Sequence, residues 1–520
     1  MKKLRISAVI MCIVMITAVI GSAFTVSAQE AGSTTDKTEI VIGADYEPTS
    51  FDYYHSETDA QVSIVSIIYD RLFTWVGDEL VCQLAESYEY EGEDELDLVI
   101  HLKEGVSFTN GNPFTADDVL FTLEKNQSEL GVAVKFACID MENSYARDDY
   151  TVVLHLYEFD NTLLPYLAGE FGAILDKEYI EAQGWDKGFE QNPVGTGPYV
   201  LENWNMGDSV SLVPNDQYWG SEEDQPFERI IFKFFQEDSI RSLEFEQGNV
   251  DVAFVGTSAS VDRLSGREAD GIRVASIPLT KIGDFCMATI IDDETFVDEN
   301  KRLAVAYAID IPAIVETIAG STAVPATSII PSGCEGYQNM AYEYNPELAK
   351  EYLVKAGCPD GFTFTMEVAN NQQLNLELAE AIQAYLSMVG INMVISPVDF
   401  FTQFSNMLAG NQLCSIMVAT ANGDASMALA AFEPGSGLCI SENHDEEFVR
   451  LAGLVRHERD EAQRMEYLAQ LQQYVHDKAF TIPVYERVYA LAYHDYVSGV
   501  ENCGIKGENM IYANRLSFNR

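Results

Sequence analysis

Residues 362–419 read FTFTMEVANNQQLNLELAEAIQAYLSMVGINMVISPVDFFTQFSNMLAGNQLCSIMVA, and this stretch decides the fold class. Apolar residues alternate in three short runs, and in the two segments between them they recur every three or four positions. The first pattern is typical of β-strands and the second of helices. Together they predict strands at 362–368, 391–395 and 413–419 and helices at 378–389 and 401–408. Strands that alternate with helices over short connections predict a largely parallel sheet with helices on both faces.

The same alternation continues outward along the chain. Asn345, Pro346 and Gly357 form a cap, a first helical residue and a stop for one more helix. Thr115 and Asp118 have the spacing of a capping box at the start of another helix. Further strands are predicted at 40–44, 96–102, 152–156, 230–234 and 250–254, and further helices along the apolar positions from Ile64 to Leu72 and from Ile240 to Phe245. The chain is therefore predicted to be an α/β protein.

Two segments are predicted to cross between lobes. One lies near residues 277–285 and contains Pro278 and Gly283, and the other lies near residues 482–493 and contains Pro483. Because they bracket the α/β stretch, the chain is expected to leave one lobe, build a second and return. We expect the first lobe at 39–280, the second lobe at 285–482 and the return to the first lobe at 483–520.

The first 28 residues have the pattern of a signal peptide. A short basic region precedes an apolar run from Ile6 to Ile20, and Val26-Ser27-Ala28 provides the small residues that precede a cleavage site. An uncleaved membrane anchor is the alternative. Cys12 lies inside the apolar run, so no cysteine is placed for a lipid anchor. Residues 29–38 are predicted to be a linker, and the chain is expected in the periplasm or on the outer face of the cell envelope.

Composition limits the possible partners and cofactors. The formal net charge is −51, which would repel nucleic acids and anionic lipids. Eight cysteines follow the leader, at positions 82, 138, 286, 334, 358, 414, 439 and 503. No two of them have CxxC spacing, so no metal site or other cofactor is expected, and disulfides cannot be assigned from the sequence.

Catalytic signatures are scarce. The sequence has no GxSxG, HExxH, P-loop or GxGxxG motif, and its seven histidines are scattered. His444 lies among acidic residues, which is more typical of a solvated loop than of a metal site. We therefore expect a binding protein without enzymatic activity; an exported acidic hydrolase is the alternative.

The loops that follow the predicted strands are candidate ligand contacts, because ligands of open α/β sheets bind beyond the carboxyl ends of strands. In the second lobe these loops include 370–371 and 420–426, and in the first lobe 45–51 and 256–260. Their candidate ligand-binding residues are Asn370, Asn371, Thr420, Asn422, Asp424, Tyr46, Glu47, Ser50 and Thr257. Ordinary caps and turns are the alternative role for each polar side chain.

Four motifs, in order along the chain, resemble those of the family 5 extracellular solute-binding proteins. Residues 108–119 read FTNGNPFTADDV, and residues 195–220 contain GTGPY, then Trp204, then NDQYWG. Residues 248–253 read GNVDVA, and residues 302–310 read RLAVAYAID and are followed by Pro331. Glycine, proline and aromatic residues dominate these motifs, so most of them are expected to shape turns and fill the core.

The resemblance implies a function and a more detailed fold. The family serves ABC importers of peptides and nickel and has two α/β lobes, two crossovers and a subdomain inserted in the first lobe, here at about 80–190. Ligand is enclosed when the lobes close, and the implied partners are the ligand and the permease subunits of a membrane importer, with the chain itself a monomer. In the family's peptide binders an aspartate of the loop matching 421–426 holds the α-ammonium group, which implies this role for Asp424, although Ala425 replaces the usual proline.

The ligand class follows from further residues. No arginine occurs between Arg302 and Arg450, and only Lys350 and Lys355 are lysines there. The family's dipeptide binders clamp the terminal carboxylate with a basic group, so an oligopeptide or a neutral or cationic solute is expected instead. All four tryptophans lie in the first lobe. An oligosaccharide is therefore the second choice, and nickel the last.

Overall fold

The computed structural model describes residues 37–55, 58–77, 79–129, 132–185, 189–288, 293–409, 411–420, 424–429, 445–504 and 511–519. Thr38–Ser517 form one compact unit, which contains the sheets and helices of the fold. The predicted signal peptide and nearly all of the predicted linker lie outside the described residues.

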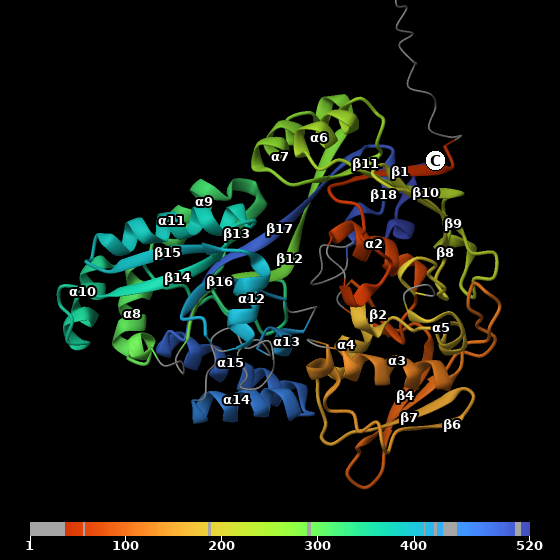
Figure 1. The fold of residues 1–520 in the computed structure, drawn as a ribbon, viewed down its shortest axis with the longest axis horizontal. Helices are drawn as coiled ribbons and strands as arrows, with labels where there is room; N and C mark the ends of the chain where they lie inside the picture. Colours follow the sequence, from red (N-terminus) through yellow and green to blue (C-terminus); the bar gives the residue numbers. More distant parts are fainter. Residues whose placement is uncertain are drawn as a thin grey trace, which may run out of the picture. The chain divides into compact units, whose positions relative to one another are not determined.

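One sheet of eleven strands runs through this unit (Figure 1). Its order is β15 (Asn392–Val398), β14 (Thr363–Ala369), β16 (Cys414–Thr420), β12 (Ile272–Met287), β17 (Thr481–His494), β11 (Val252–Val255), β1 (Glu39–Ala44), β10 (Arg229–Phe234), β9 (Ser209–Pro214) and β8 (Tyr199–Asn205), with β13 (Ala323–Pro325) on β17. The three strands of the opening sequence stretch are present. β14 and β16 lie within one residue of their predicted limits, whereas β15 ends three residues beyond the predicted end at 395.

The sheet is mixed. β14 runs parallel to β15 and β16, and β1 runs parallel to β10 and β11. All other pairs are antiparallel, because β8 and β9 form a hairpin and because β12 and β17 run in opposite directions between the two parallel groups. The prediction of a largely parallel sheet is therefore wrong for the whole sheet and holds only within each of these groups.

β12 and β17 join the two parallel groups. They pair with each other from Ile272 opposite His494 to Cys286 opposite Thr481. β12 also pairs with β16 over residues 281–287, and β17 also pairs with β11 over residues 490–493. The predicted lobe limits at 280–285 and 482–483 fall inside these two strands, and these limits remain a prediction.

Gly283 allows the close packing of these two strands. A Cβ atom added at Gly283 would lie 2.2 Å from a ring carbon of Tyr485, its partner on β17. The absence of a side chain therefore lets the tyrosine ring lie flat over β12, where its hydroxyl donates to Asn375 Oδ1 at 2.8 Å. The glycine predicted to mark a crossing thus has a packing role at that crossing.

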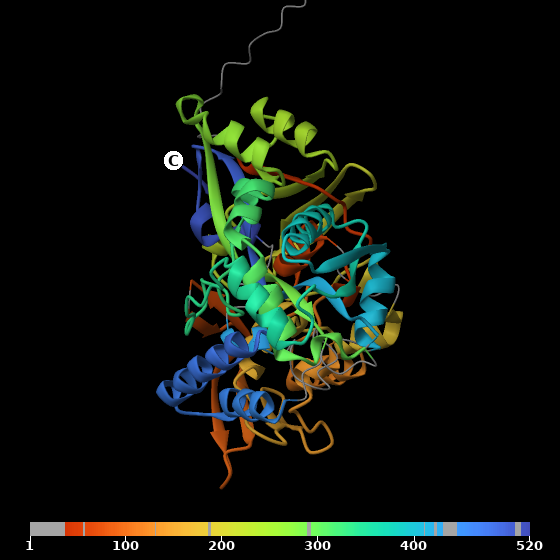
Figure 2. The same ribbon diagram turned by 90° about the vertical axis from the view of Figure 1, so that its left-hand side faces the viewer.

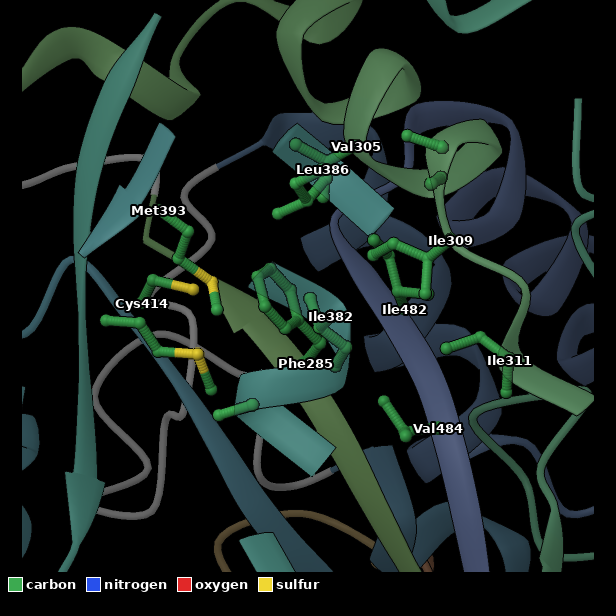
Figure 3. Packing of buried hydrophobic residues seen from close by; sticks show 14 of the residues in the cluster. Phe285, Val305, Ile309, Ile311, Ile382, Leu386, Met393, Cys414, Ile482 and Val484 are labelled. Carbon is green, nitrogen blue, oxygen red and sulfur yellow. The ribbon is translucent and has the colours of Figure 1, made fainter. Parts of the chain in front are cut away.

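Helices cover both faces of the sheet around β12, β14 and β16. One face packs against α8 (Glu299–Ala308), α9 (Ile311–Ile318), α10 (Pro346–Lys355) and α11 (Gln373–Ser387). Figure 3 shows this core, in which Phe285 of β12 lies close to Ile382 of α11 and Ile482 of β17. The other face packs against α12 (Phe400–Leu408), α13 (Ala425–Leu429), α14 (Glu446–His457) and α15 (Glu461–Lys478). The last two helices lie against each other (Figure 1, Figure 2).

A second sheet, which is entirely antiparallel, has its own hydrophobic core. Its order is β4 (Ala85–Glu91), β5 (Asp97–Leu102), β7 (Thr151–His155) and β6 (Tyr145–Asp148). Side chains of α3 (Ala116–Ser128) and α4 (Leu163–Ala168) pack on it in a cluster that includes Phe108, Phe114 and Val119. This sheet lies within the subdomain predicted at about 80–190, whose limits remain a prediction.

Local signals set the helix limits, with one exception. The capping box of α3 is present, since the backbone N of Thr115 donates to Asp118 Oδ2 at 2.8 Å. α10 begins after Asn345, as predicted. α2 (Asp59–Ile68), however, ends before Leu72, so the predicted extension to Leu72 is wrong. Asp70 explains the difference: its carboxylate accepts hydrogen bonds from Trp219 Nε1 and Gln83 Nε2, both at 2.7 Å, and holds an extended segment there.

Candidate functional site

A pocket of about 560 Å³ lies between the four-stranded subdomain and the helices α13 and α15. The volume falls in the range of about 300–1,000 Å³ that small-molecule sites occupy. The subdomain side contributes Trp75, Leu80, Asn161, Leu164 and Pro165, and the opposite side contributes Gly333, Cys334, Glu335, Asp424, Ala425, Glu461, Arg464 and Met465. The pocket is therefore lined by two parts of the chain that are far apart in sequence.

The subdomain wall of the pocket is mainly apolar. Trp75 lies in β2 (Phe73–Val76), Leu80 in β3 (Glu79–Cys82), and Leu164 and Pro165 in α4. Trp75, Leu80 and Leu164 also pack against the buried core of the subdomain, and Pro165 is itself buried. The core thus fixes the positions of these side chains, which reduces the conformational entropy that a ligand would have to remove.

The opposite wall is charged. Asp424 immediately precedes α13, and its Oδ2 lies 3.1 Å from Arg464 Nη1 on α15. Asp424 Oδ1 accepts the backbone N–H of Ser426 at 2.7 Å. Arg464 also donates through Nε and Nη2 to the two carboxylate oxygens of Glu461, at 3.0 and 2.8 Å. Burial alone would lower the pKa of Arg464, but the hydrogen bonds with Glu461 and the charge of Asp424 outweigh burial and raise it.

The subdomain contacts α14 beside the pocket. The backbone N of Asn161 donates to Arg456 O at 3.0 Å, and its Nδ2 lies 2.9 Å from the same oxygen and 2.7 Å from Glu458 O. The last carbonyl groups of a helix have no partner within the helix. Asn161 therefore caps α14 from another part of the chain, and an ion pair of 3.2 Å between Asp160 and Arg456 supports the cap.

A second contact joins α13 to the subdomain. Met427 of α13 is buried in the core cluster of the subdomain together with Leu163 and Leu167 of α4. The next residues of α13, Ala428 and Leu429, belong instead to the cluster around α14 and α15. α13 thus connects the two walls of the pocket a short distance from Asp424.

Three of the four residues predicted in the first lobe have side chains that form hydrogen bonds within the protein. Glu47 Oε2 accepts the backbone N–H of Gly207 at 2.6 Å, and Ser50 Oγ accepts that of Asp52 at 3.2 Å. Thr257 caps α7 (Ser258–Ser265), and its hydroxyl donates to Asp238 Oδ2 at 2.7 Å. Tyr46 is 52% exposed. None of these four side chains lines the described pocket, and ligand contact by them remains a prediction.

The structure places the residues predicted in the second lobe in different environments. Asn370 and Asn371 are exposed after β14, and the backbone N of Asn370 donates to Val398 O at 2.8 Å. Thr420 ends β16, but its side chain and the whole of Asn422 lie outside the described residues. Asp424 is therefore the one predicted residue that lines the pocket as far as the structure describes it.

Sequence reasoning missed Arg464 and the apolar wall. Basic residues are rare between Arg302 and Arg450, and Arg464 lies beyond that interval, forty positions after Asp424. An arginine beyond that interval was the available signal for a cationic partner of Asp424. No local pattern marked Trp75 or Leu164, since their contribution depends on how the subdomain packs against α13 and α15.

Asp284 of β12 is an unusual buried acid. It is fully buried, and neither carboxylate oxygen has a hydrogen-bond partner among the residues that the structure describes. Alternation along the strand places it on the same face as Cys286, which packs with Ala425 and Leu429 of α13. Burial raises the pKa of Asp284 well above its usual value. The carboxyl group is thus favoured in its neutral form behind the charged wall of the pocket.

The next feature is the set of side chains that could bind a metal ion or form disulfide bonds in the described part of the chain. No group of three or more His, Cys, Asp or Glu side chains there could hold a metal ion, and His444 lies outside it. Cys82, Cys138, Cys286, Cys358, Cys414 and Cys503 form no disulfide. Across the same residues, no helix has both the length and the hydropathy needed to cross a bilayer.

Residues 79–435 match the family model described as bacterial extracellular solute-binding proteins, family 5 Middle. The chain is 26% identical over 368 residues to the glutathione-binding protein GsiB of Escherichia coli O1:K1 / APEC, covering 69% of this chain and 70% of that protein. It is 26% identical over 448 residues to the dipeptide-binding protein of Escherichia coli (strain K12), covering 79% and 82% of the two chains.

Solved structures share the fold. The periplasmic binding protein DppA of Helicobacter pylori, solved with the peptide STSA, superposes with a TM-score of 0.78 at 22% identity and covers 93% of this chain and 98% of its own. The protein AppA of Clostridium difficile superposes with a TM-score of 0.80 at 18% identity, and the match covers 92% of this chain and 100% of that one.

Proposed function

This chain belongs to the family 5 bacterial extracellular solute-binding proteins, and we propose that it captures a peptide between two lobes and presents it to the permease subunits of an ABC importer. Two of its relatives are described as glutathione-binding and dipeptide-binding proteins. A structural neighbour was solved with a bound peptide. The proposal includes export directed by residues 1–28, a monomeric chain and capture without catalysis.

The observation that carries the proposal is the pocket lined from two sides. A ligand that touches both the subdomain wall and the wall of α13 and α15 would favour the arrangement in which the walls face each other, because it binds that arrangement more tightly than an open one. In this proposal β12 and β17 are the two crossovers about which the lobes move. The cap of Asn161 on α14 and the buried side chain of Met427 would hold the closed form.

Within this pocket we assign the α-ammonium group of the peptide to Asp424. Its side chain is only 14% exposed, which makes a hydrogen bond between two charged groups stronger than it would be in bulk water. Arg464 neutralises part of its charge, but Oδ2 has a single described partner. A planar carboxylate oxygen accepts more than one hydrogen bond, so Asp424 has capacity for an ammonium group in addition to Arg464.

Calorimetric titration tests the assignment. The wild-type protein should bind a peptide with a free amino terminus about 10–100-fold more tightly than its N-acetylated form, since a hydrogen bond to a charged group contributes about 1.5–3 kcal/mol. Asp424→Asn should remove most of this difference, and it preserves the size of the side chain.

Asp262→Asn on α7 serves as the matched control, because it removes an exposed carboxylate that is far from Asp424 in the sequence. It should leave both affinities unchanged. Equal affinity for free and acetylated peptides in the wild type would refute the role of Asp424. A lack of binding across a broad panel of peptides would refute the proposed function itself.

A further inference from the structure

The two walls of the pocket differ in chemistry, and this difference bears on which peptides enter. Resting on the proposed function, we infer that the site selects peptides whose amino-terminal residue has an apolar side chain and rejects those in which it is acidic. Three observations support the inference: a fixed apolar wall, an excess of carboxylates opposite it, and an arginine four of whose five N–H groups already have partners.

The apolar wall provides the attraction. The side chains of Trp75, Leu80 and Leu164 line the pocket and also pack on the subdomain core. A peptide held at Asp424 by its ammonium group would have its first side chain within the same pocket. An apolar side chain would there leave water for a preformed apolar surface, and each buried methylene group would contribute about a fourfold gain in affinity.

The carboxylates provide the rejection. Glu335, Asp424 and Glu461 line the pocket, and Arg464 is the one cationic side chain in its described lining. Three carboxylates against one guanidinium give the lining a formal charge of −2. A ligand carboxylate in this pocket would be repelled and would lose its hydration without gaining a cationic partner.

Arg464 is not free to supply that partner. Its Nε and Nη2 donate to Glu461, and its Nη1 donates to Asp424 and, at 3.1 Å, to Ser426 Oγ. The side chain is 9% exposed. These contacts use four of the five N–H groups of the guanidinium and leave one N–H of Nη2. To bind a ligand carboxylate through two hydrogen bonds, the guanidinium would have to break one of these existing contacts.

A series of tripeptides of the form X-Ala-Ala tests the inference by calorimetric titration. We expect peptides with X = Leu or Phe to bind at least tenfold more tightly than the peptide with X = Ser, and the peptide with X = Glu to bind more weakly than that with X = Ser. Trp75→Ala should reduce the preference for Phe over Ser about tenfold. Leu164→Ala, a smaller perturbation of the same wall, should reduce the preference for Leu.

Val76→Ala is the matched control, since Val76 follows Trp75 in β2 but is 57% exposed and does not line the pocket. It should leave the preferences unchanged. Equal affinities for all four peptides, or tightest binding for X = Glu, would overturn the inference and leave the proposed function standing. Binding of none of the peptides, in this series or a broader panel, would instead overturn the proposed function.

Discussion

Replacing Asp284 with asparagine should make the protein more stable at neutral pH. The carboxyl group of Asp284 is fully buried in β12, and in the described part of the chain neither of its oxygens has a hydrogen-bond partner. An isolated carboxylate in such a place is costly, so the group is expected to take up a proton instead. Asparagine has nearly the same shape and carries no charge at any pH.

The sign and size of the effect follow from the raised pKa of Asp284. Between the unfolded-state pKa of about 4 and the higher folded-state pKa, the folded protein binds more protons at this site than the unfolded protein. The free energy of unfolding therefore decreases with increasing pH across this window, by about 1.4 kcal/mol for each pH unit. Within this window the asparagine variant should therefore gain stability relative to the wild type as the pH rises, because it has no proton to lose.

Urea denaturation of both proteins from pH 4 to pH 8 measures this difference. Asp70 and Asp118, whose pKa values burial raises to about 6, impose part of the same trend on both proteins. The difference between the two curves removes their contribution. Asp262→Asn on α7 exchanges an exposed carboxylate for the same amide and controls for the loss of one formal charge. A difference between wild type and Asp284→Asn that does not change with pH would refute the reasoning.

Three further changes test the packing around the site. Asn161→Ala removes the cap on the carboxyl end of α14. If the cap holds the closed form, the variant should release bound peptide about threefold to tenfold faster, as measured by stopped-flow fluorescence. An unchanged dissociation rate would exclude that role. Gly283→Ala places a Cβ atom 2.2 Å from the ring of Tyr485 and should destabilise the protein by about 1–3 kcal/mol in urea denaturation. Gly453→Ala in α14, with no atom within 4 Å of the added Cβ, should stabilise it by up to about 1 kcal/mol; equal effects of the two glycine changes would contradict the packing argument.

Sequence periodicity predicted the local elements well, because alternation and helical spacing depend on neighbouring residues. β14 and β16 lie within one residue of their predicted limits, and β15 begins one residue after its predicted start and ends three residues beyond its predicted end. The resemblance of the motifs to the family 5 solute-binding proteins is confirmed by the match over residues 79–435. Helix α2 shows the limit of the method: the apolar residue at position 72 fits the helical spacing, but the hydrogen bonds of Asp70 end the helix earlier.

Long-range features could not be read from the sequence. Strand direction depends on how β12 and β17 cross the sheet, which spacing does not encode, and so the sheet was predicted as largely parallel. The position of Asp424 in a pocket follows from its strand and loop, and the sequence indicated it. Its partner Arg464 and the apolar wall at Trp75 come from α15 and the subdomain, and tertiary packing alone brings them together.

In the proposed complex a peptide binds between the two walls of the pocket with its amino terminus at Asp424. A crystal structure of the protein with the peptide Leu-Ala-Ala would show whether it does. We predict the peptide nitrogen about 3 Å from a carboxylate oxygen of Asp424 and the leucine side chain against Trp75 and Leu164. A peptide bound outside the pocket, or one with its carboxylate at Asp424 and Glu461, would contradict the account.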